Sequence, residues 1–174
     1  MVKYTSFYKV KTEDKKEDKV LFTSFLTENS FQTKKIGQSF AKDILKLHLA
    51  KRAVVFGLRG DLGGGKTTFL QGFARGLGIK EKILSPTFIV MRRLEINNPH
   101  FNNFYHLDCY RIKRLKEISD LGLKEIMSDA KNIVAIEWAG IIKKILPKDC
   151  VMLEFEFMGK NKRKITMKQN YHGE

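Results

Sequence analysis

One glycine-rich segment constrains this chain more than any other feature of its sequence. Gly60-Asp61-Leu62-Gly63-Gly64-Gly65-Lys66-Thr67 matches the pattern GxxxxGK[ST] in full. The apolar run at residues 53–58 precedes it and is rich in β-branched residues, as in a strand buried on both faces. Apolar residues follow it at helical spacing, at Leu70, Phe73 and Leu77. The order of strand, glycine loop and helix is the setting that a phosphate-binding P-loop requires.

Each residue type in this loop suits the binding of phosphate groups. The glycines permit strained backbone angles and turn several N–H groups inward, and the helix that follows adds positive charge at its N-terminus. Lys66 is expected to reach the β- and γ-phosphates, and the Thr67 hydroxyl to bind Mg²⁺. The predicted ATP contacts in the loop are therefore Gly60, Asp61, Leu62, Gly63, Gly64, Gly65, Lys66, Thr67 and Thr68.

The choice of ATP over GTP depends on a missing motif. GTPases recognise guanine with Asn-Lys-x-Asp, and the segment Asn161-Lys162-Arg163-Lys164 lacks the final carboxylate. We therefore predict ATP and Mg²⁺ as the cofactors.

A P-loop also needs an acidic residue on the magnesium side, usually at the end of a neighbouring strand. Asp108 ends the run at residues 104–108, and Glu137 ends the run at residues 133–137. A strand-terminal acid in an α/β sheet is often only a helix cap or a surface charge, so the residues alone leave both explanations open. The hydroxyls of Ser85 and Thr87 fit a switch loop that senses the γ-phosphate, although a plain Ser-Pro turn is the more common explanation.

The remaining patterns alternate between strands and helices. Strands are predicted at residues 20–26, 87–94, 103–109 and 132–138, and a final hairpin at 151–157 and 163–167. Helices are predicted at 33–49 with Ser30 as N-cap, at 112–129 with a break around Gly122, and at 141–146. The fold class is α/β: a single P-loop NTPase-like domain at residues 20–170, with a central mostly parallel sheet flanked by helices and a C-terminal antiparallel hairpin. Residues 1–19 are predicted to be a flexible charged lead-in.

Composition limits the remaining possibilities. The net charge of +14 is compatible with a nucleic-acid or acidic partner, but its spread along the chain favours a generally lysine-rich protein. The sequence shows no secretory signal and no apolar stretch of membrane-spanning length, which predicts a cytoplasmic protein without a membrane partner. Cys109 and Cys150 are expected to be reduced and buried, and no structural zinc is expected.

Four segments together resemble one family. They are residues 60–69, Ser85-Pro86-Thr87-Phe88, His106-Leu107-Asp108-Cys109-Tyr110-Arg111 and Ile136-Glu137-Trp138, and their order and spacing are similar to those of the TsaE (YjeE) family. The resemblance covers roughly residues 33–163. It implies a bacterial P-loop ATPase that is needed to make threonylcarbamoyladenosine in tRNA. It also implies TsaD and TsaB as partners and contact with tRNA through the complex. Weak hydrolysis without these partners is expected, because the chain is short and shows no obvious lid over the site.

The resemblance also implies roles for individual residues. Asp108 becomes the magnesium-side acid and Glu137 lies near the γ-phosphate, so Lys66, Asp108 and Glu137 are the implied catalytic set. Thr67, Asp108 and Glu137 are the implied Mg²⁺ ligands. Trp138 is expected beside the nucleotide, Thr33 near the adenine, and Ser85 and Thr87 in a switch-like loop. The roles of Tyr110 and Arg111 stay open.

Two other functions are compatible with a P-loop. A small-molecule P-loop kinase would usually carry an arginine-bearing lid, and residues 112–129 contain only Arg114. The second alternative is a non-catalytic module that binds nucleotide to shape a complex. The TsaE resemblance is partly of this kind, because the ATPase of that family serves an assembly.

Overall fold

The computed structural model describes residues 18–46, 51–86 and 90–172, and for residues 18–21 and 169–172 it describes the backbone alone. The strands in these ranges are β1 (Asp18–Thr27), β2 (Val54–Arg59), β3 (Met91–Glu95), β4 (Asn103–Asp108), β5 (Asn132–Glu137), β6 (Val151–Phe157) and β7 (Arg163–His172). The helices are α1 (Ser30–Ile44), α2 (Lys66–Gly76), α3 (Leu115–Ser119), α4 (Leu123–Ser128) and the 3₁₀ helix η1 (Ala139–Ile145).

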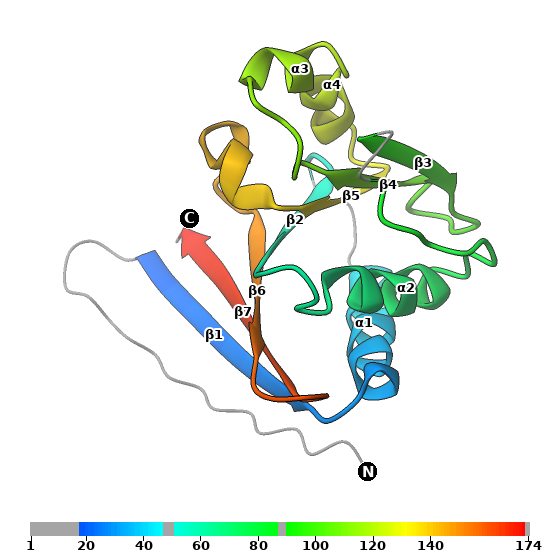
Figure 1. Ribbon diagram of the computed structural model, residues 1–174. Coiled ribbons are helices and arrows are strands. Elements are labelled where there is room, and N and C mark those ends of the chain that lie inside the picture. The colour runs from blue at the N-terminus through cyan, green and yellow to red at the C-terminus, as the bar shows by residue number, and fades with distance from the viewer. Residues whose placement is uncertain (1–17, 47–50, 87–89, 173–174) are drawn as a thin grey trace.

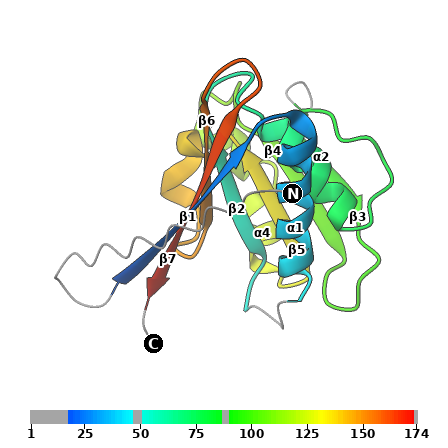
Figure 2. The ribbon, with the colours of Figure 1, turned by 90° about the horizontal axis from the view of Figure 1, so that it is seen from below.

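The strands form one seven-stranded sheet in the order β1-β7-β6-β2-β5-β4-β3. The central strands β6, β2, β5 and β4 run parallel to one another, whereas β3, β7 and β1 join the two edges in antiparallel fashion. The predicted α/β fold with its parallel centre and its C-terminal hairpin β6–β7 is therefore confirmed. The sequence did not indicate that β1 pairs along its whole length with β7, and Figure 2 shows this pair extending beyond the other strands.

Helices cover both faces of the central strands (Figure 1). One core lies between the sheet and helices α1 and α2, and includes Phe56, Phe69, Phe73 and Phe104. The other lies between the sheet and α3, α4 and η1, and includes Leu107, Ile118, Leu123 and Ile142. Burial on both faces explains why β5 is apolar almost throughout, since all six of its residues are buried.

Two glycines fix the close crossing of α1 and α2. A Cβ atom at Gly37 would lie 2.2 Å from the carbonyl oxygen of Phe69, and one at Gly72 would lie 2.0 Å from that of Lys34. Any side chain at either position would therefore push the helices apart. Because α2 begins at the P-loop, this contact fixes the loop's helix against α1.

The start of α1 differs from the prediction. Asn29, not Ser30, is the N-cap: its backbone is extended, and its side-chain oxygen accepts a hydrogen bond from the Gln32 amide at 2.9 Å. Both residue types cap helices well, so sequence preference alone did not separate them. The helix ends at Ile44, and residues 47–50 of the longer predicted helix lie outside the described residues.

Several smaller expectations can be compared with the fold. The strand predicted from residue 87 begins at Met91, and residues 87–89 lie outside the described residues. The predicted break at Gly122 is confirmed, since this glycine has a φ of 66° between α3 and α4. Both cysteines are free and buried as expected, and burial raises the pKa of each thiol to about 12. Within the described ranges no helix is long and apolar enough to cross a membrane.

Candidate nucleotide-binding site

The glycine loop connects the end of β2 to the start of α2, as its sequence predicts. Gly60, Gly63 and Gly65 have φ angles of 133°, 73° and 101°, a region that other residues rarely adopt. A Cβ atom at Gly60 would also lie 2.3 Å from the carbonyl oxygen of Phe155, so β6 excludes a side chain there. The glycines are thus required by the conformation and by the close approach of the neighbouring strand.

Lys66 is the first residue of α2, directly after the last glycine of the loop, with only 5% of its surface exposed. Its Nζ atom donates hydrogen bonds to the carbonyl oxygens of Gly60 at 2.7 Å and Asp61 at 2.9 Å. It also lies 4.2 Å from the centre of the Trp138 ring. Burial lowers the pKa of Lys66, while the negative charges of Glu137, Asp108 and Asp61 act in the opposite direction. The ammonium group is therefore fixed at the loop and faces acidic side chains.

The two predicted acids lie side by side at the ends of β4 and β5. Asp108 and Glu137 are paired in register across these parallel strands, and both are buried. Thr67 Oγ1 donates to both carboxylate oxygens of Glu137, at 3.1 Å each. This contact joins the P-loop helix to β5, and the strand register places Asp108 beside Glu137.

Asp108 has its own set of hydrogen bonds. Ser85 Oγ donates to its Oδ2 at 2.5 Å, and the Tyr110 amide donates to its Oδ1 at 2.9 Å. The structure thus places Ser85 beside the predicted magnesium-side acid. Thr87, the other residue of the predicted switch, lies outside the described residues.

The oxygen donors at this point fit Mg²⁺. The ion prefers hard oxygen ligands and commonly binds through one or two carboxylates, completed by substrate phosphates and water. Thr67, Asp108 and Glu137 supply one hydroxyl and two carboxylates. In the described part of the chain, no group of three or more His, Cys, Asp and Glu side chains is arranged to hold a metal ion. These residues therefore suit a metal that a phosphate-bearing ligand helps to bind, rather than an all-protein metal cage.

A hollow of about 330 Å³ opens in front of these groups. Its lining consists of Tyr110 and most of the predicted site residues, namely Leu62, Gly63, Gly64, Gly65, Lys66, Thr67, Thr68, Ser85, Asp108, Glu137 and Trp138. Gly60 and Asp61 take part through their carbonyl contacts with Lys66. The segments that the sequence singled out separately therefore meet at one place.

Thr33 lies beside the P-loop but does not line this hollow. Its methyl carbon is 3.8 Å from the position that a Cβ atom would take at Gly65. Its hydroxyl lies 2.9 Å from that of Thr27 and 3.3 Å from the carbonyl oxygen of Asn29. The observed contacts thus connect α1 to β1 and to the loop, and a contact with adenine stays a prediction.

Two residues have site contacts that the sequence reasoning missed. Arg163, at the start of β7, donates from Nε and Nη2 to the carbonyl oxygen of Gly63, at 3.2 and 3.0 Å. His106 Nε2 lies 2.9 Å from Glu137 Oε1. Strand alternation gave a signal for His106, because it lies two positions before Asp108 and therefore on the same side of β4. No local pattern pointed to Arg163.

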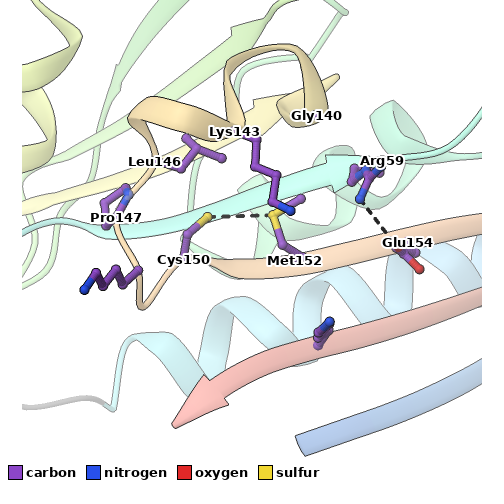
Figure 3. A pocket seen from close by; sticks show the side chains of 10 residues that line it. Arg59, Gly140, Lys143, Leu146, Pro147, Cys150, Met152 and Glu154 are labelled. Atoms are coloured by element: carbon purple, nitrogen blue, oxygen red, sulfur yellow. Dashed lines mark hydrogen bonds and ion pairs between the residues drawn. The ribbon is translucent and has the colours of Figure 1, made fainter. Parts of the chain in front are cut away.

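A second hollow, of about 300 Å³, lies between η1 and the strands β2, β6 and β7 (Figure 3). Four cationic side chains line it: Arg59, Lys143, Lys148 and Lys168. Its single acidic side chain, Glu154, forms an ion pair with Arg59 at 3.5 Å. We refer to this hollow as the basic groove; none of the predicted site residues lines it.

A glycine loop between a central parallel strand and a helix, with a buried lysine, a hydroxyl and two strand-end carboxylates, defines the P-loop class of nucleotide-binding proteins. Within this class the chain belongs to the TsaE family. The family model described as "Threonylcarbamoyl adenosine biosynthesis protein TsaE" matches residues 27–165.

Similar proteins agree with this assignment. The tRNA threonylcarbamoyladenosine biosynthesis protein TsaE of Bacillus subtilis is 37% identical over 140 residues, which cover 80% of this chain and 81% of the relative. The protein of the same name from Haemophilus influenzae is 31% identical over 129 residues, covering 74% and 78%. The crystal structure of Bacillus YdiB superimposes with a TM-score of 0.68 at 31% identity, covering 86% of each chain.

Proposed function

We propose that this protein binds and hydrolyses magnesium-ATP, and that hydrolysis supports N6-threonylcarbamoyladenosine formation in tRNA together with TsaD and TsaB homologues. Family membership supports the pathway. The observation that carries the ATP site is the meeting of Lys66, Thr67, Asp108 and Glu137 at one hollow.

The chemistry assigned to these residues is phosphoryl transfer to water. Lys66 holds the β- and γ-phosphates, and Thr67 and Asp108 hold Mg²⁺, which when bound neutralises phosphate charge. Glu137 orients a water molecule toward the γ-phosphorus and, as general base, takes the proton that the water loses when it attacks. The bond between the γ-phosphorus and the bridging oxygen breaks as the water oxygen bonds to phosphorus, so the products are ADP and inorganic phosphate.

Slow hydrolysis by the isolated protein follows from the open site. Large apolar side chains are exposed around or beside the hollow, with 72% exposure for Leu62, 57% for Leu84 and 46% for Tyr110. Exposed apolar groups gathered at one place are typical of a surface that another protein covers. A partner that docks on them would exclude water and order the segments that flank the phosphates.

We expect the TsaD–TsaB pair to raise ATP hydrolysis severalfold or more, and Leu62→Ser to remove most of this rise. The matched control is Ile145→Ser, which removes an exposed apolar side chain beside Lys51 and Arg52, residues that precede β2 at the end opposite the P-loop. Phosphate release with and without partners, at several partner concentrations, measures both effects. Equal stimulation of the two variants would contradict docking at the mouth of the site.

The basic groove gives this stimulation a dependence on salt. Lys143, Lys148 and Lys168 have no carboxylate within ion-pair distance among the described residues, so their charge is available to an acidic surface. Salt screens charges that are more than about 10 Å apart at 0.1 M. Stimulation should therefore weaken as salt rises, mainly through a higher partner concentration at half-maximal rate.

The test of the whole proposal is a reconstituted tRNA modification assay over repeated cycles. It compares wild-type protein, Lys66→Ala and no added protein, each with TsaD, TsaB and the other substrates present. Equal modification in all three would refute the role in the pathway even if ATP binds. A small-molecule kinase would instead move the γ-phosphate to a metabolite, and a screen of acceptors with labelled ATP detects that outcome.

Trp138 offers a direct report on the nucleotide. It is the single tryptophan of the chain, and its ring lies beside Lys66 Nζ and 5.0 Å from the Tyr110 ring. Magnesium-ATP should change its emission in a saturable way, with a midpoint that matches the calorimetric Kd. A flat titration, with binding shown by calorimetry, would place Trp138 away from the nucleotide.

A further inference from the structure

His106 is a buried histidine that the reaction described above does not use. It lies in β4 with no exposed surface, and its ring stacks on Phe104 with centroids 6.3 Å apart. Its Nε2 atom lies 2.9 Å from Glu137 Oε1. Its Nδ1 atom is buried and has no hydrogen-bond partner in the described part of the chain.

These contacts determine where the proton of the ring lies. A carboxylate only accepts hydrogen bonds, so Nε2 must carry the hydrogen that faces Glu137. The geometry therefore points to a hydrogen on Nε2, through which His106 orients Glu137.

The contact defines how the Glu137 carboxylate is turned. Thr67 Oγ1 donates to both oxygens at the same distance, 3.1 Å, and so does not distinguish them. His106 approaches Oε1 alone. Of these two contacts, only that with His106 thus sets which oxygen remains available toward the hollow.

We propose that His106 is a positioning residue that holds Glu137 in the orientation needed to direct water at the γ-phosphate. This inference rests on the proposed hydrolysis. Residues that orient a catalytic or metal-binding group by a hydrogen bond typically contribute about 10–100-fold to activity. The contribution should appear in kcat, because the side-chain hydrogen bond of His106 in the described part of the chain goes to Glu137 and not to the P-loop backbone or Lys66.

Three substitutions separate orientation from packing. His106→Gln keeps an N–H donor at nearly the position of Nε2, His106→Asn has a donor that is too short to reach Glu137, and His106→Leu has none. In the partner-stimulated reaction we expect His106→Leu and His106→Asn to lower kcat by about 10–100-fold with little change in KM for ATP. His106→Gln should keep most of the wild-type kcat. The proposal would be overturned if the three variants had equal kcat, or if the substitutions raised KM for ATP and left kcat unchanged.

A double substitution guards against a purely structural effect. In a Glu137→Gln background, His106→Leu should lower kcat no further, because the group that it positions is already disabled. Thermal unfolding of each variant shows whether it folds. An additive loss of kcat among folded variants would mean that His106 acts independently of Glu137, and would also overturn the proposal.

A measurement without ATP distinguishes this proposal from the proposed function. Nitrogen-15 NMR of the imidazole rings, with His106 assigned from the His106→Gln spectrum, should show its hydrogen on Nε2 in the wild type. A ring without a hydrogen on Nε2 would contradict the contact itself. If the contact is present but no partner elicits hydrolysis, the proposed function fails, and the positioning role fails with it.

Discussion

Lys66→Ala is expected to lower the affinity for magnesium-ATP by at least ~100-fold. Charge-assisted hydrogen bonds contribute about 1.5–3 kcal/mol each, and two phosphate contacts made by one ammonium group together correspond to roughly that loss. The buried ammonium lies at the loop, fixed by the carbonyl oxygens of Gly60 and Asp61. No other cationic side chain lines the hollow in the described part of the chain, so none replaces it.

Isothermal calorimetry of the folded variant measures this effect. Lys124→Ala is the matched control, since it removes an exposed lysine from α4, which packs on the opposite face of the sheet from α2. The control should bind like the wild type. Unchanged affinity in Lys66→Ala would show that the nucleotide binds elsewhere.

Glu137→Gln should leave binding of magnesium-ATP within a few-fold of wild type and slow its hydrolysis by ~10²–10⁴-fold, the usual contribution of a general base. The substitution keeps the size of a fully packed side chain. The amide oxygen can still accept from His106, and the Thr67 hydroxyl can rotate to accept from the amide nitrogen. The fold and the P-loop contact should therefore survive while the negative charge is lost.

Asp108→Asn is the matched comparison for Glu137→Gln, because it removes the same charge from the neighbouring strand end. It should chiefly raise the magnesium concentration needed for half-maximal hydrolysis. Single-turnover rates and magnesium titrations separate the two variants. Wild-type hydrolysis in both would refute both assigned roles.

The local chemistry of the site was predictable from the sequence. The P-loop conformation depends on glycines that accept positive φ, and the strand before it and the helix after it follow from short-range apolar patterns. Asp108 and Glu137 were identifiable as strand-terminal acids. Sequence reasoning left open whether either acid lay at the site, because nothing local says which strands are neighbours.

Only the tertiary structure decided how these parts meet. The order β2-β5-β4 places Asp108 and Glu137 in register on neighbouring strands. The hydrogen bond from Thr67 to Glu137 joins residues that are 70 positions apart in the chain. Arg163 reaches Gly63 across 100 residues, and β1 completes the sheet by pairing with β7. Strand order and such contacts depend on the burial of both sheet faces by the whole chain, whereas backbone conformation within a loop or helix depends on neighbouring residues. The sequence by itself therefore determined the phosphate-binding loop, and the tertiary fold determined which acids, hydroxyls and histidine face it.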